Sequence, residues 1–134
     1  MKKILLLTVA LLNVLLLSAQ GVYQLWGMTP AGGENNLGVI YNTNANGDNF
    51  RLKHNFNFTN SGSQPGHSGL TEYNNKFYGM TGTGGENNSG IIFEWDPSTN
   101  SMIKKFGFGS GDGKYPDGNL TLHGVGVLIF QTNF

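Results

Sequence analysis

The chain has 134 residues, equal numbers of basic and acidic side chains, and no cysteine. The lack of cysteine excludes disulfides, thiolate zinc sites and a cysteine nucleophile. All 21 glycines follow residue 20, and only 16 residues of the chain are charged. Such a composition is typical of a small domain built from many turns.

The N-terminus has the pattern of a secretory signal. Lys2 and Lys3 precede an apolar stretch that runs from Ile4 to Leu17, and small or polar residues follow it. The stretch is shorter than the roughly 20 residues of a membrane-spanning helix, so residues 1–19 are predicted to be a cleaved signal helix and residues 20–134 a secreted, non-spanning chain. Cleavage would leave an acidic excess, and we expect no nucleic-acid partner.

The rest of the chain repeats itself. Residues 25–29 (LWGMT) align with residues 77–81 (FYGMT) at an offset of 52, and the alignment continues through the loop GGENN and the run GVIY or GIIF. The offset then falls to 50, and Leu120-Thr121 begins a third copy. We place copy 1 at about 22–68, copy 2 at about 69–118 and a partial copy 3 at about 119–134. A period near 50 is typical of solenoids and propellers.

Each copy contains four short apolar runs separated by turn residues. In copy 2 these runs are 69–72, 76–81, 90–95 and 102–108. Ile91, Ile92 and Phe93 are apolar in succession, so their strand is predicted to be buried on both faces. The fold class that follows is all-β, with propeller-like blades of four antiparallel strands, about two copies and the start of a third.

The repeated motif resembles the GloVer-type (Gloeo/Verruco) tandem repeat of secreted bacterial proteins, over about residues 25–121. That resemblance implies a secreted, propeller-like array and brings no catalytic residues. The residues assigned to the structural motif are Trp26, Gly27, Met28, Gly32, Gly33, Gly38, Tyr78, Gly79, Met80, Gly84, Gly85 and Gly90.

The end of the chain departs from the pattern. After Thr121 the run Val125–Phe130 stands where an aromatic-Gly-Met-Thr sequence is expected. We expect this run to be an unpaired apolar strand. The outer faces are also expected to lack a partner on at least one side, including at Ile91, Ile92, Phe93, Phe106 and Phe108. The chain is therefore predicted to be a fragment of a longer array or to associate with itself through open edges.

Polar candidates give no catalytic, cofactor or metal site. Glu34 and Glu86 have the chemistry of a glycosidase pair, but their equivalent positions in solvated loops favour a turn role. The glycine pairs in these loops lack the lysine of a phosphate loop. The three histidines are scattered, and Ser68 lacks a nucleophile elbow. Residues 112–117 carry two aspartates, which makes weak calcium binding a minor alternative.

Aromatic residues are the remaining candidates. Trp26 aligns with Tyr78, and Tyr41 with Phe93, so these four are assigned to packing between copies. Trp95 and Tyr115 border loops and are predicted as surface ligand contacts. The leading function is a secreted, non-enzymatic β-repeat module for structural or adhesive interaction at the cell surface. The alternatives are a glycan-binding module and a non-catalytic part of a secreted hydrolase.

Overall fold

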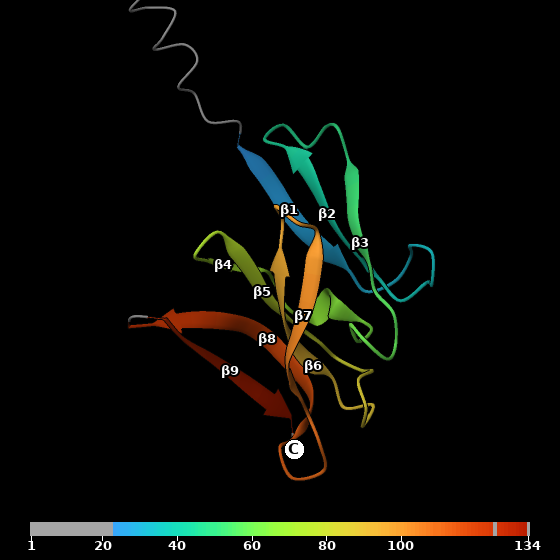
Figure 1. Ribbon diagram of the computed structural model, residues 1–134, viewed down its shortest axis with the longest axis vertical. Helices are drawn as coiled ribbons and strands as arrows, with labels where there is room; N and C mark the ends of the chain where they lie inside the picture. The colour runs from blue at the N-terminus through green and yellow to red at the C-terminus, as the bar shows by residue number, and fades with distance from the viewer. Residues whose placement is uncertain (1–22, 125, 134) are drawn as a thin grey trace, which may run out of the picture.

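The computed structural model describes residues 23–124 and 126–133, so the predicted signal segment 1–19 lies outside it. The described residues form β-strands and one short 3₁₀ helix, and every strand pair is antiparallel (Figure 1). This confirms the all-β fold class. In the same residues, no helix is long and apolar enough to cross a membrane.

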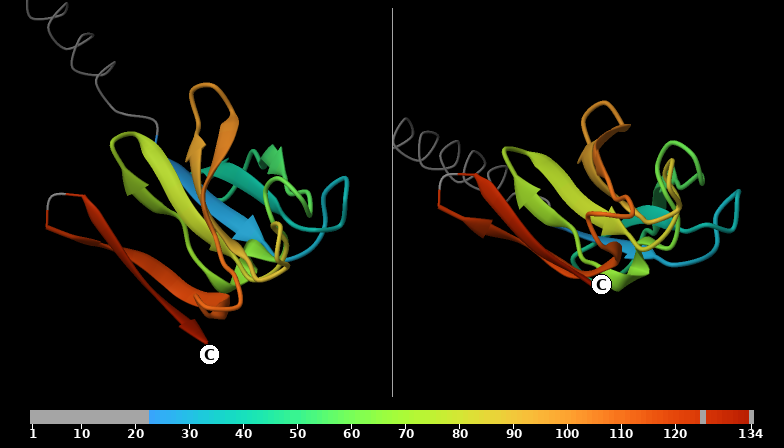
Figure 2. Two further views of the ribbon diagram at one scale, coloured as in Figure 1. Left: turned by 60° about the horizontal axis from the view of Figure 1, so that its bottom comes forward. Right: turned by 90° about the horizontal axis from the view of Figure 1, so that it is seen from below.

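The strands make three separate sheets in chain order. The first has order β1-β2-β3, the second β4-β5-β6-β7 and the third β8-β9. Copy 1 therefore shows three of its four predicted strands, and most of the residues equivalent to β4 precede residue 23 and lie outside the described residues. Their bounds are β1 (Gln24–Thr29), β2 (Val39–Asn44), β3 (Arg51–Asn55), β4 (Thr71–Tyr73), β5 (Lys76–Thr81), β6 (Ile91–Asp96), β7 (Ser101–Gly107), β8 (Lys114–His123) and β9 (Val127–Asn133), with η1 at Pro65–His67. The second sheet lies between the other two (Figure 2).

The second sheet is the four-stranded unit predicted for copy 2. Three of its hairpin turns fall where turn residues separate the apolar runs, at Asn74-Asn75, 82–90 and 97–100. Asn74, Asn75 and Asn100 have φ between 51° and 59°, which asparagine tolerates better than most residues. Ile91 and Phe93 are fully buried and Ile92 is half-buried, which confirms that β6 is covered on both faces.

The end of the chain is paired, so the expectation of an unpaired strand at Val125–Phe130 is wrong. β9 begins at Val127 and pairs with β8, with His123 opposite Val127 and Thr121 opposite Ile129. The preceding copy explains this pairing. Thr71–Tyr73 and Lys76–Thr81 form the equivalent hairpin β4-β5, so the third copy starts with the same two strands although its motif differs.

A shared core joins the first two sheets. Trp26 of β1 lies with its ring centroid 5.1 Å from those of both Phe77 and Trp95 in the second sheet. Phe56, which follows β3, meets Phe93 edge-on at 5.5 Å. Contacts between rings of the two copies confirm that Trp26 and Phe93 pack copy against copy. Tyr41 and Tyr78 differ from this prediction, because the rings they meet, Phe50 and Tyr73, belong to their own copies.

The predicted open faces of copy 2 are covered. Ile91 and Phe93 are 0% exposed and Phe108 is 1% exposed, so the expectation that they lack a neighbour is wrong. The first sheet covers Phe93 through Phe56, and β8 packs against β4 and β5 on the other side. Phe106 differs from this group because 42% of it is exposed.

The glycine of the aromatic-glycine motif leaves room for an aromatic ring on the neighbouring central strand. Gly79 lies opposite Phe93, and a Cβ on Gly79 would stand 2.6 Å from Cζ of that ring. In the first sheet, Gly27 lies opposite Tyr41, whose hydroxyl would be 2.7 Å from such a Cβ. Glycine is needed here because the ring on the neighbouring strand occupies the space of a side chain.

Candidate functional site

The repeated GGENN loop is a self-contained structural unit. Asn36 and Asn88 have φ of 54° and 51°, and each side chain accepts a hydrogen bond at 3.0 Å from the backbone N–H of Gly32 or Gly84. The preceding asparagine, Asn35 or Asn87, donates to the backbone carbonyl of the phenylalanine that follows the last strand of its sheet, Phe56 or Phe108. These bonds occur in both copies, which explains the motif without a ligand.

The last glycine of each loop meets the linker that leads to the next copy. A Cβ on Gly38 would stand 2.8 Å from Cδ of Pro65, and one on Gly90 would stand 2.8 Å from Cδ of Pro116. The residues before these prolines also correspond. The N–H of Gln64 donates to the carbonyl of Leu37 at 3.2 Å, and Tyr115 donates to Ser89 at the same distance.

The glutamates of the repeated loop have no acid–base arrangement. Glu86 is exposed and forms an ion pair with Lys104 at 2.6 Å between Oε1 and Nζ. The hydrogen bond from Lys104 lowers the pKa of Glu86, which is opposite to what a general acid requires. Glu34 is exposed in the equivalent loop, and its backbone N–H donates to Asn55.

A charged cluster lies in the second sheet instead. Glu94 of β6 is only 5% exposed, and its carboxylate accepts hydrogen bonds from Lys76, Lys105 and the Tyr78 hydroxyl. The bonds from Lys76 and Lys105 hold the pKa of Glu94 at about 2 despite its burial. In the first sheet, Asn42 occupies the equivalent position and donates to Gln24 at 2.7 Å. The cluster is therefore a charged version of a structural contact between neighbouring strands.

Histidines and aspartates remain dispersed in the described residues. His54 packs edge-on against Phe56, and burial lowers its pKa. Asp112 and Asp117 accept hydrogen bonds from the nearby backbone N–H groups of Gly109 and Gly118. Among residues 23–124 and 126–133, no three metal-ligating side chains come together.

The two aromatic residues predicted at the surface differ in outcome. Trp95 is 0% exposed, so its predicted surface position is wrong. It lies on the same face of β6 as Ile91 and Phe93, which is the face that the first sheet covers. Tyr115 is 52% exposed, and its role as a ligand contact stays a prediction.

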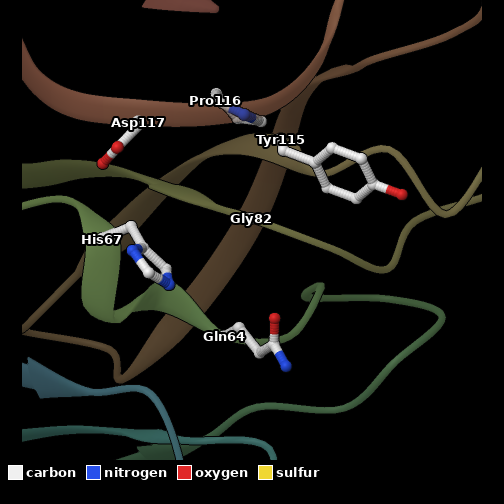
Figure 3. A pocket seen from close by; sticks show the side chains of 6 residues that line it. All are labelled: Gln64, His67, Gly82, Tyr115, Pro116 and Asp117. Carbon is white, nitrogen blue, oxygen red and sulfur yellow. The ribbon is translucent and has the colours of Figure 1, made fainter. Parts of the chain in front are cut away.

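Tyr115 lines an open pocket of about 270 Å³ at the junction of the second and third sheets. The other lining residues are Gln64, His67, Gly82, Pro116 and Asp117. Gln64 and His67 come from the segment before β4, Gly82 directly follows β5, and Pro116 and Asp117 lie beside Tyr115 near the start of β8. In Figure 3, His67 and Asp117 lie on one side of Gly82 and the Tyr115 ring lies on the other.

Of the residues that line this pocket, the sequence predicts only Tyr115 as a ligand contact. The signal for the pocket is the alignment of Gln64-Pro65 with Tyr115-Pro116 at an offset of 51, between the offsets of the two stronger matches. Only the proline of this pair is identical, which is too little to be noticed without the structure. The side chains that line the pocket also differ between the copies, so no repeated pattern points to them.

Repeated sheets, repeated loops and repeated junctions define this chain as a tandem β-repeat protein. The sequence pattern of the Gloeobacter/Verrucomicrobia repeat matches residues 13–133. The chain therefore belongs to this repeat family, as its motif residues predicted. No curated protein and no solved structure matches the chain.

Proposed function

We propose that the chain is a secreted, non-enzymatic β-repeat module that makes structural or adhesive contacts at the cell surface, with its sheets as propeller-like blades. The observation that carries the proposal is a division of roles between residues. Those that recur in both copies, such as Gly79, Gly85 and Gly90, serve packing within and between sheets. Side chains that differ between copies at equivalent positions, such as Gln64 and Tyr115, lie at the surface. A constant scaffold with variable exposed loops suits binding.

Adhesion is tested by displaying the full chain on bacterial cells that lack it. We expect these cells to adhere to polysaccharide-coated or cell-coated surfaces more than cells that display a Gly90→Ala variant, whose fold the substitution disrupts. Equal adhesion by the two strains would contradict the proposal. Turnover of chromogenic glycoside, ester or peptide substrates that follows the pure protein through purification would contradict its non-enzymatic part.

Secretion has its own test. Export from a secreting host should remove residues 1–19, because a charged start, an apolar middle and a small end are all present. Mass spectrometry of the exported protein should find an N-terminus near Gln20. Exported protein that still begins at Met1 would contradict it.

A glycan-binding module is the second candidate. The observation that favours it is the exposed ring of Tyr115 beside polar side chains in the pocket of Figure 3. Exposed aromatic rings suit the apolar faces of sugars.

A further inference from the structure

The backbone around the pocket is unusual in one respect. Eight described residues other than glycine have positive φ, and six of them are asparagines. The two exceptions are Gln64 and Tyr115, with φ of 57° and 51°, and both line the pocket. Positive φ is unfavourable for glutamine and more so for a bulky aromatic residue, and the proline that follows each adds a restriction.

This placement has a consequence for side-chain choice. Everywhere else in the described chain, positions with positive φ carry the residues that tolerate it, glycine or asparagine. At the equivalent positions 64 and 115, the chain instead carries a long amide and a phenol, and both side chains lie beside the same pocket. Backbone strain of this kind gathers at functional sites, because there the side chain is needed for a contact outside the fold.

The polar groups that face the pocket are available to a ligand. Gln64, His67 and Tyr115 are exposed, and their side chains make no hydrogen bond to any other residue among those the structure describes. Asp117 uses Oδ1 for the N–H of Gly118 at 2.8 Å, and it has no ion-pair partner within the described chain. The pocket is thus lined by an amide, an imidazole, a phenol and a carboxylate, together with the backbone of Gly82.

We propose that this junction pocket binds one ring of a neutral pyranose-containing glycan. The Tyr115 ring packs on the apolar face of the sugar, while the side chains of Gln64 and Asp117 form hydrogen bonds with its hydroxyl groups. A neutral sugar matches the lining because the Asp117 carboxylate accepts hydrogen bonds from hydroxyl groups. The same carboxylate would repel an acidic sugar. Planar aromatic surface and a few convergent polar groups are the usual makeup of a small-ligand pocket. The inference rests on the proposed adhesive function and names its ligand.

The room for the ligand depends on Gly82. A Cβ there would have the carbonyl oxygen of Gln64 at 3.5 Å and Cδ2 of His67 at 3.8 Å, which are ordinary contacts. The equivalent position in copy 1 is Pro30, so the fold accepts a side chain at this point. A larger residue at 82 therefore fills the pocket floor while the sheet stays folded.

The test is a titration of the full chain with cellotetraose, mannotetraose and the neutral chitin tetramer, followed by amide NMR. We expect at least one of them to shift the amides of Gly82 and Asp117. Tyr115→Asn removes the ring and suits positive φ, and Gly82→Val fills the floor. Each should weaken binding by about tenfold or more.

Matched controls are Tyr23→Asn, at an exposed tyrosine outside the pocket, and Gly111→Val, where a Cβ meets no atom within 4 Å. Both should bind as the parent does.

Three results would overturn the inference. They are no shift at these amides with any neutral tetramer, binding that survives both pocket substitutions, and binding confined to an acidic oligomer such as tetragalacturonate. Displayed cells that still adhere while the pocket fails these tests would leave the adhesive function standing. Loss of adhesion by cells whose protein still binds the tetramer would contradict that function and leave the pocket assignment standing.

Discussion

At the scale of residues, the repeat depends on glycines whose place no other residue can take. Gly33 and Gly85 have φ of 76° and 74° in equivalent turns. A Cβ on Gly85 would also stand 2.7 Å from Cγ2 of Ile91, and one on Gly33 would stand 2.5 Å from Oδ1 of Asn55. Backbone conformation and space therefore both require glycine at these two positions.

Gly33→Ala and Gly85→Ala should each lower the free energy of unfolding by about 1 kcal/mol or more, since strain and close contact add. Urea denaturation followed by circular dichroism measures this. Gly111→Ala is the matched control, because Gly111 lacks positive φ and a Cβ there meets nothing within 4 Å. If Gly33→Ala and Gly85→Ala both had the same urea midpoint as Gly111→Ala, glycine would not be required in these two turns.

Glu94 makes a second prediction about a single residue. Its pKa in the folded chain is about 2, against an ordinary value of 4.5. The unfolded chain therefore binds more protons between these values, and stability from this carboxylate is present above pH 4.5 and lost as the pH falls towards 2. Glu94→Gln should lower the melting temperature at neutral pH and flatten its decline in acid.

The first sheet supplies a control for that experiment. The pair Gln24 and Asn42 occupies the positions of Lys76 and Glu94 without charge. The double variant Lys76→Gln with Glu94→Asn introduces this uncharged pair into the second sheet. It should make the melting temperature fall less steeply in acid, to the same extent as Glu94→Gln, while a hydrogen bond between the strands is kept. An unchanged acid decline in both variants would assign the pH dependence to other groups.

At the scale of elements, the sequence predicts most strands and turns and the burial of β6 on both faces, but it does not predict the burial of Trp95. β5 spans the predicted residues 76–81 because apolar runs and turn residues alternate plainly in copy 2. Trp95 was misplaced because it precedes the turn residue Asp96, and closeness to a turn in sequence says little about the face on which a side chain lies. The alternation of Ile91, Phe93 and Trp95 on one face of β6 was the better guide, and only the neighbouring sheet shows that this face is covered.

Pairing of β5 with β6 gives a prediction for these elements. Gly79→Ala should destabilise the chain by about 1–3 kcal/mol, because the new methyl group would meet the Phe93 ring in a packed core. Phe93→Leu removes part of that ring and should partly rescue Gly79→Ala. A double-mutant cycle measures the rescue as a coupling energy. Additive effects of the two substitutions would show that the ring and the glycine act independently.

At the scale of the whole molecule, the sheets share a core, so the first two copies should unfold together. The chain has two tryptophans, Trp26 and Trp95, and they meet across the interface between these copies with centroids 5.1 Å apart. Tryptophan fluorescence therefore reports the interface itself, whereas circular dichroism reports all sheets. The sequence predicts that Trp26 packs between copies, but it does not predict the contact with Trp95, because residues 69 positions apart in the chain come into contact only through the packing of one sheet on another.

We expect the urea transitions seen by fluorescence and by circular dichroism to coincide in the parent chain, as they do when one cooperative unit unfolds. Trp26→Ala removes the ring that touches both Phe77 and Trp95, and it should destabilise the chain by about 2–4 kcal/mol. Tyr23→Ala, at a residue that is 80% exposed, is the control and should leave both transitions in place. If fluorescence changed at lower urea than circular dichroism in the parent chain, the interface would open before the sheets unfold. Each copy would then be a separate folding unit, and the shared core would contribute little to stability.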